Sequence, residues 1–146
     1  MKVLNELFTS IYKGNEDAIR LSTQLWDLAQ TWDDLYDGDP ISRDAVNKAF
    51  TDALFMLPAN PLYGPDIQAN LLNVYLRWQD ANIIESSNAS DNELAKAWML
   101  RAGIYDLFVL IAAKLYGLAW ATKIGPTVRK MYGETLEDYI EEMRNA

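Results

Sequence analysis

The chain has 146 residues, half of them hydrophobic, and contains neither cysteine nor histidine. This length is typical of one domain, and the two missing residue types exclude disulfide bonds, thiolate or imidazole metal ligands and catalytic triads built on histidine. The 21 acidic and 13 basic side chains give a net charge of −8, which repels nucleic-acid phosphates and anionic lipid. We therefore expect no nucleic-acid partner, and any chemistry must come from carboxylates, Lys, Arg, Tyr, Ser or Thr.

Two segments bear on export and membrane insertion. The N-terminal segment has Asn5 and Glu6 where a signal peptide needs an apolar core, so we expect a cytoplasmic protein. The most apolar stretch, residues 102–121, contains Asp106 and Lys114. Each charge would cost about 2.5 to 3.5 kcal/mol near the centre of a membrane helix, so the sequence predicts a buried helix and no membrane span.

Apolar residues recur at helical spacing along almost the whole chain, and no segment keeps the alternating pattern of a strand, which predicts an all-α fold. We expect a first helix over residues 2–13 and a second from an Asn15 cap to Gly38. A third helix is expected from about residue 42 to 57, where Pro58 stops it. The expected core stripe of the second helix comprises Leu21, Leu25, Leu28, Trp32 and Leu35.

The C-terminal half of the chain predicts further helices. The fourth helix spans about residues 66–86, and Ser90 and Glu93 then form a capping box at the start of the fifth. The fifth helix is expected to run from residue 91 to about 123, to be apolar over more than half of its circumference, and to end at Gly125-Pro126. It is long enough to be the central element of the fold.

A sixth helix is expected to begin near Thr135, where the spacing of residues suggests another cap. We therefore expect residues 1–146 to form a single domain, a bundle of about six helices around the central apolar helix. Aromatic residues at helical spacing are assigned to its core. If five neighbours cannot cover the central helix, the surplus apolar surface predicts a protein partner, most simply a second copy in a homodimer.

An acidic cluster, Asp33, Asp34 and Asp37, lies near the end of the second helix. Their spacing of three and four residues puts the carboxylates on one face, and the partial negative charge of the helix C-terminus makes this placement unfavourable. Two interpretations stay open. The cluster is either a solvated acidic helix end or a site where Mg²⁺, or a neighbouring Arg or Lys, compensates the charge.

Two further charges continue apolar stripes toward the core, Glu85 on the fourth helix and Arg101 on the fifth. A buried charge needs a partner. A hairpin about residue 88 would separate these two groups by roughly 15 Å along the helix axis. The sequence therefore predicts that Arg101 finds its anion on a third helix, with the acidic cluster as the candidate.

Asn82 and Glu85 are three residues apart and repeat the geometry of Asp34 and Asp37. Two such pairs on different helices could hold Mg²⁺ with water completing its shell. Arg101 and Lys114 are then candidates for binding phosphate, which together would suit a diphosphate. The alternative for Lys114, as for Asp106, is that it is a solvated charge or part of a hydrogen bond between helices.

Three patterns in the sequence resemble those of known families. Asp33-Asp34-Leu35-Tyr36-Asp37 resembles the DDxxD motif of class I isoprenoid synthases, which implies Mg²⁺ and a prenyl diphosphate. The pairs Asp34/Asp37 and Asn82/Glu85 resemble the acidic pairs of the all-α nucleotide pyrophosphohydrolases, which implies Mg²⁺ between helices. The stretches WDDLYDGDPIS and LPANPLYG resemble small helical proteins of tailed phages, which implies a location in the host cytoplasm.

Two functions are consistent with the sequence. The first is a phage-like helical protein that acts through protein contacts, as an assembly factor, an inhibitor or an adaptor, without catalysis. The second is a magnesium-dependent protein that binds or hydrolyses a diphosphate. The negative charge, the aromatic content and the lack of a second aspartate-rich motif favour the first.

Overall fold

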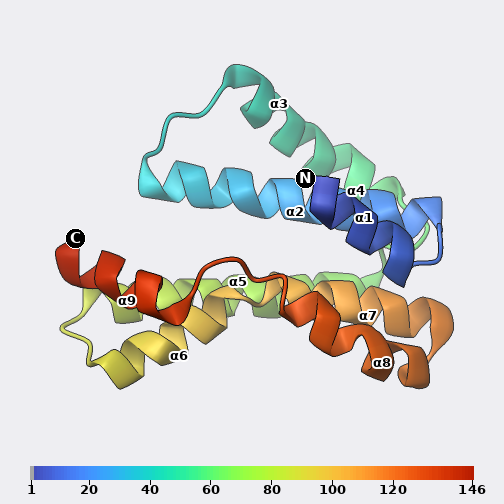
Figure 1. Cartoon of the computed structure of the whole chain (residues 1–146). Coiled ribbons are helices and arrows are strands. Elements are labelled where there is room, and N and C mark those ends of the chain that lie inside the picture. The colour runs from blue at the N-terminus through green and yellow to red at the C-terminus, as the bar shows by residue number, and fades with distance from the viewer. Residues whose placement is uncertain (1) are drawn as a thin grey trace. The chain divides into compact units, whose positions relative to one another are not determined.

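A computed structural model describes residues 2–146 and confirms the all-α fold, because all regular structure in this range is helical (Figure 1). The chain divides into two compact units, one up to Gln68 and one from Ala69 onward. Within residues 2–146, no helix is both long enough and apolar enough to span a membrane. The two units are described separately.

The first unit contains the elements that its capping signals predict. They are α1 (Lys2–Ile11), α2 (Glu16–Asp37), α3 (Arg43–Thr51), the π-helical segment η1 (Asp52–Met56) and α4 (Leu57–Ala59). The side chain of Asn15 accepts a hydrogen bond from the N–H of Ala18, and that of Ser42 accepts one from the N–H of Ala45. Gly38 ends α2 in a left-handed conformation with φ 73°, which a residue with a side chain rarely adopts. The caps thus fix the start of α2 and α3 and the end of α2.

The core stripe predicted for α2 is buried only along its first part. Leu21 and Leu25 are fully buried, whereas Trp32 and Leu35 are 47% and 50% exposed, so their assignment to the core is wrong. The 10-residue α1 packs on α2 and is less than half as long as the 22-residue α2. The helix that covers the start of the stripe is therefore too short to cover its end.

The helix after Ser42 also departs from the prediction at its end. Pro58 does not stop it, because proline is tolerated in the first turn of a helix and Pro58 lies at the start of α4. The helical path ends at Asn60, whose buried side chain donates a hydrogen bond to the carbonyl of Asp17, 2.9 Å away. This bond ties the proline-rich loop to the start of α2.

The second unit contains most of α5 (Pro65–Ser86), followed by α6 (Asp91–Arg101), α7 (Ile104–Tyr116), α8 (Leu118–Arg129) and α9 (Leu136–Asn145). The predicted capping box at Ser90 and Glu93 is confirmed, and so is the cap at Thr135. Buried residues from three helices and a loop make a core cluster on which α9 packs. They are Ala81, Ala89, Leu94, Ala97 and Tyr139.

The prediction of a single central helix over residues 91–123 is wrong, because this segment contributes to three helices. The chain breaks after Arg101, and at Gly117, with φ 87°, it reverses so that α7 and α8 form a hairpin (Figure 1). Gly103 lies close to α5, since a Cβ added there would be 3.4 Å from Cγ1 of Val74. Pro126 lies inside α8 and does not end it. The apolar pattern therefore marks helical residues correctly but not the points where the chain turns.

Candidate functional site

The aspartates of the predicted metal site lie in the last part of α2. Asp33 and Asp34 are half-buried and Asp37 is exposed. They belong to the first unit, whereas Asn82 and Glu85 belong to the second. In residues 2–146, no group of three or more acidic side chains is arranged to hold a metal ion. The magnesium site stays a prediction, and the positions of these side chains add no support for it.

Arg101 forms a largely buried ion pair with Glu85, so the predicted separation of these two groups along the helix axis is wrong. Nε of Arg101 lies 2.5 Å from Oε2 of Glu85, and Nη2 lies 2.5 Å from Oε1. Nη2 also donates to Oδ1 of Asn82 at 2.5 Å, and the hydroxyl of Tyr139 donates to Oε2 of Glu85. One carboxylate thus joins α5, α6 and α9.

The predicted separation failed because it placed both charges level with their own Cα atoms. Side chains on a helix lean toward its N-terminus. In an antiparallel hairpin, Glu85 therefore leans away from the loop, and Arg101 leans toward it, so the two long side chains approach each other. The paired guanidinium has little capacity left for a ligand, and phosphate binding by Arg101 stays a prediction.

Asn82 carries a second, unusual feature of this cluster. Its side chain is 5% exposed, and Nδ2 is a buried donor with no hydrogen-bond partner among the described residues. Burying an unsatisfied donor typically costs about 1 to 3 kcal/mol. The side chain of Asn82 is therefore held by the hydrogen bond from Arg101 to its oxygen, while its amide nitrogen makes no compensating hydrogen bond.

Glu134, in the segment between α8 and α9, forms an acidic pair with Glu142 of α9 near the Arg101 ion pair. The carbonyl of Glu134 accepts a hydrogen bond from Nε1 of Trp98, 3.0 Å away. Burial raises the pKa of the Glu134 carboxyl, and a hydrogen bond with Glu142 and the charge of Glu142 raise it further. Glu85 also raises this pKa, whereas Arg101 opposes the shift. The protonated form of Glu134 is thus favoured in the folded chain.

This shift predicts that stability falls as pH rises. Glu134 binds its proton more tightly in the folded state, so its contribution is complete below the unfolded pKa and is lost as pH rises through the folded pKa. We expect Glu134→Gln, which stays neutral, to melt above the wild type at pH 8 and close to it at pH 4. Thermal melts at both pH values measure this. Glu141→Gln, at an exposed position of α9, should show no such pH-dependent gain, and an equal gain there would contradict the assignment.

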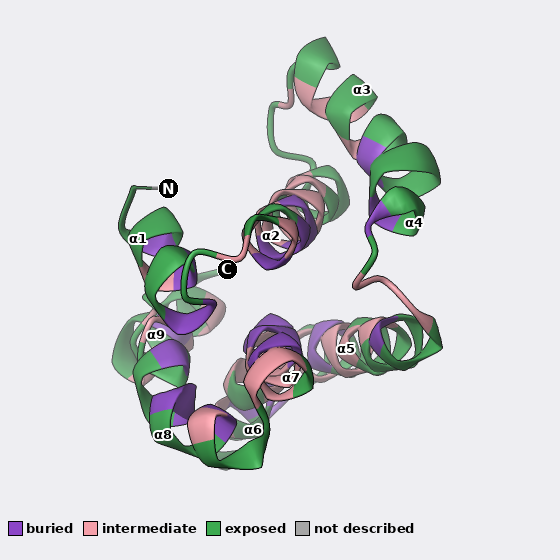
Figure 2. Ribbon diagram, turned by 90° about the vertical axis from the view of Figure 1, so that its right-hand side faces the viewer, coloured by how far each residue is buried: buried purple, intermediate pink, exposed green. Residues whose placement is uncertain are grey.

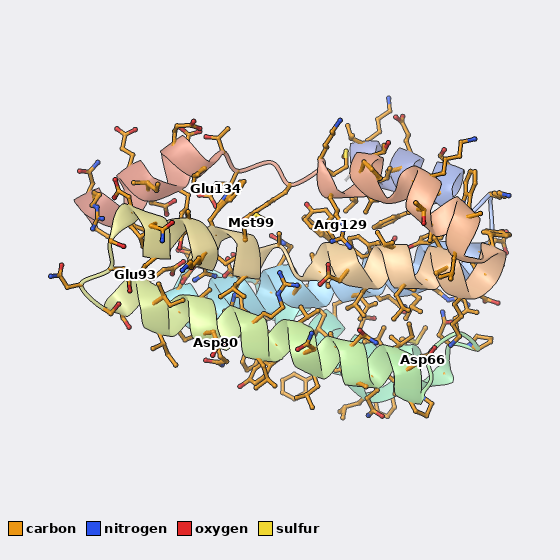
Figure 3. All side chains as sticks on the ribbon, turned by 90° about the horizontal axis from the view of Figure 1, so that it is seen from below. Asp66, Asp80, Glu93, Met99, Arg129 and Glu134 are labelled. Carbon is orange, nitrogen blue, oxygen red and sulfur yellow. The ribbon has the colours of Figure 1, made fainter. Side chains whose placement is uncertain are left out.

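The remaining predicted site residue, Lys114, is exposed in the last turn of α7, where the helix dipole favours a cation. Asp106, near the start of the same helix, is not a solvated charge. It pairs with Nη1 of Arg77 and with Nη1 of Arg129, both at 2.5 Å. Arg129 of this pair is labelled in Figure 3. The interpretation of Asp106 as a contact between helices is confirmed.

Large apolar side chains gather on the outer surface of the first unit. Phe50, Leu54 and Phe55 are 65%, 61% and 65% exposed, and we call these three residues the α3–η1 face. No residue of α3 is buried, and Figure 2 shows this helix coloured as exposed or intermediate. Exposed apolar side chains that cluster in this way often mark interaction sites, whereas single exposed apolar residues are ordinary.

Comparisons of the chain with protein-family models, curated proteins and solved structures find no match. Function therefore has to be inferred from the side chains and surfaces themselves.

Sequence reasoning did not single out Tyr139, Glu134 or Arg129. The spacing of Leu136, Tyr139, Ile140 and Met143 is the signal that could have placed Tyr139 on a buried face of α9. Nothing in the sequence shows that Arg129 reaches Asp106, because that contact depends on the turn at Gly117.

Proposed function

We propose that this chain is a protein-binding helical protein and that a partner docks on the α3–η1 face. The observation that carries the proposal is the exposure of three large apolar side chains within six residues, Phe50, Leu54 and Phe55. Aromatic side chains are enriched in protein interfaces, and they dominate the binding energy where they are buried by a partner.

The geometry of α3 explains why its own unit does not cover this face. Nζ of Lys48 lies 3.4 Å from Oδ2 of Asp27 on α2, and it also pairs with the buried Asp52. These contacts direct the Lys48 side of the helix toward α2. At about 100° per residue, Phe50 lies roughly 200° from Lys48, on the opposite side. Phe50 therefore points away from the helix on which α3 packs.

The charge of the first unit indicates what kind of partner fits. Residues 1–68 carry 11 of the 21 acidic side chains and 5 of the 13 basic ones. An acidic surround attracts positive charge and repels an acidic partner. We therefore propose a basic amphipathic segment, whose apolar side covers the α3–η1 face while its Lys or Arg residues meet the acidic surround.

Model peptides test this proposal directly. We expect an amphipathic helical peptide of Leu and Lys to bind the chain more tightly than a Leu and Glu peptide of equal length, as measured by fluorescence anisotropy. Phe50→Ser with Phe55→Ser should weaken binding of the first peptide at least roughly ten-fold, since interface aromatics often contribute about 2 kcal/mol or more.

A matched double variant keeps the experiment specific. Leu72→Ser with Ile83→Ser removes apolar side chains of similar exposure, 59% and 66%, from α5. This variant should bind the Leu and Lys peptide as the wild type does. Equal weakening in both double variants, or equal binding of the two peptides, would contradict docking on the α3–η1 face.

A further inference from the structure

An open groove runs along the α7–α8 hairpin of the second unit, with a volume of about 570 Å³. Its floor is mainly apolar and includes Leu110 and Ala113 of α7 and Ala121 of α8. The 80% exposed Leu118 lies at the turn end, and Asp106 and Arg129 lie at the other end, joined by their ion pair. The groove is thus apolar along its length and charged at one end.

The charge around this groove is opposite to that of the whole chain. Residues 107–133 contain no acidic side chain, and they contain four basic ones, Lys114, Lys123, Arg129 and Lys130. At the charged end, Asp106 is shared by two guanidinium groups, those of Arg77 and Arg129, which leaves one positive charge in excess. Residues 107–133 thus carry a positive net charge within a chain whose net charge is −8.

Arg129 has donors to spare for a ligand. Its side chain is 52% exposed, and the bond that it makes within residues 2–146 runs from Nη1 to Asp106. Nη2 and Nε are thus open to a second anion, and a guanidinium binds a carboxylate with two parallel hydrogen bonds. Asp106 keeps Arg77 as a partner, so Arg129 can turn toward a ligand without leaving that carboxylate unpaired.

The length of the groove is set by α8. Its lining residues there run from Leu118 to Arg129, about 16 Å at 1.5 Å per residue. An extended chain that lies along α8 can cover this length and reach Arg129 with one end.

We propose that the α7–α8 groove binds a linear amphipathic anion, an acyl chain whose carboxylate pairs with Arg129. The apolar tail lies along Leu110, Ala113 and Ala121 toward Leu118. This site is independent of the α3–η1 face, which belongs to the other unit. Pockets that bind small molecules are commonly apolar with a few placed polar groups, as this one is.

Gly125 offers a way to fill the groove. It lines the groove within α8, and a Cβ added there meets no atom within 4 Å apart from its chain neighbours and the backbone of its own helix. Any side chain at this position precedes Pro126, whose ring disfavours helical backbone in the residue before it, so Gly125→Ala and Gly125→Leu share this cost. Gly125→Leu therefore places a bulky side chain in the space of the ligand, and Gly125→Ala serves as its small control.

Calorimetric titration of the full chain with monomeric dodecanoate tests the proposal. We expect binding to the wild type and to Gly125→Ala, loss of binding in Gly125→Leu, and at least ten-fold weaker binding in Arg129→Gln. Lys130→Gln removes the same charge one residue away, outside the groove lining, and should weaken binding less than two-fold. Dodecylamine, with the same tail and the opposite charge, should not bind. Circular dichroism checks that each variant stays helical.

Three results would overturn the proposal. The first is the absence of heat with dodecanoate in the wild type. The second is equal binding of dodecylamine, or equal weakening by Lys130→Gln and Arg129→Gln, since either would remove the role of Arg129. The third is that Gly125→Leu binds monomeric dodecanoate as tightly as the wild type does. The ligand would then lie on the surface of the chain and not in the groove.

Discussion

Glu85→Ala is expected to lower the free energy of unfolding by about 3 to 5 kcal/mol, because it leaves a largely buried guanidinium without its counter-charge. The side chains of Arg101 and Glu85 are only 17% and 13% exposed, so water cannot replace the lost carboxylate fully. The hydroxyl of Tyr139 loses its acceptor in the same variant. Urea unfolding followed by circular dichroism measures the change.

A double variant separates the cost of an unpaired charge from the loss of the pair. Glu85→Leu with Arg101→Met replaces both charges with apolar side chains, and buried ion pairs can often be replaced in this way with little loss. We expect this variant to be more stable than Glu85→Ala. A loss below about 1 kcal/mol in Glu85→Ala would show that the pair behaves as a solvated surface salt bridge.

Phe8→Ala is expected to destabilise the first unit by about 3 to 5 kcal/mol, the usual cost of removing a buried phenylalanine side chain. Phe8 is 1% exposed and stacks on Tyr12, with the ring centroids 5.9 Å apart. Tyr12 in turn accepts a hydrogen bond from the buried hydroxyl of Ser22, 2.7 Å away on α2. The cavity therefore opens beside the contacts that hold α1 on α2.

Val3→Ala on the same helix is the matched control for Phe8→Ala. Val3 is 62% exposed, and surface substitutions usually change stability by no more than about 0.5 kcal/mol. Chemical unfolding of both variants provides the comparison. Similar losses in the two variants would show that α1 does not pack with its Phe8 side inward.

Local signals in the sequence predicted the starts of helices well. The caps at Asn15, Ser42 and Thr135 and the capping box at Ser90 all form as expected. Each depends on a side chain and a backbone group only three residues away, so the residues themselves contain the information.

Features that depend on distant residues were not predictable in this way. An apolar segment such as residues 104–124 has the same pattern whether it continues or reverses, and Gly117 is compatible with either. The pairing of Arg101 with Glu85 depends on how two side chains lean across a hairpin. The exposure of Trp32 depends on the length of α1. The candidate surfaces depend on such turns and contacts between distant residues, so they could be identified only from the structure.

The π-helical segment η1 changes which residues of its helix share a side. The N–H of Leu57 donates to the carbonyl of Asp52, five residues earlier, and both residues are buried, at 2% and 4% exposure. In an α-helix, residues five apart would be separated by about 140° around the axis. A one-residue deletion within η1 would bring Asp52 and Leu57 four residues apart, which in an α-helix is only about 40° around the axis. The π-helical turn thus accommodates one extra residue, and a chain without that residue would keep the same inward and outward sides in α4.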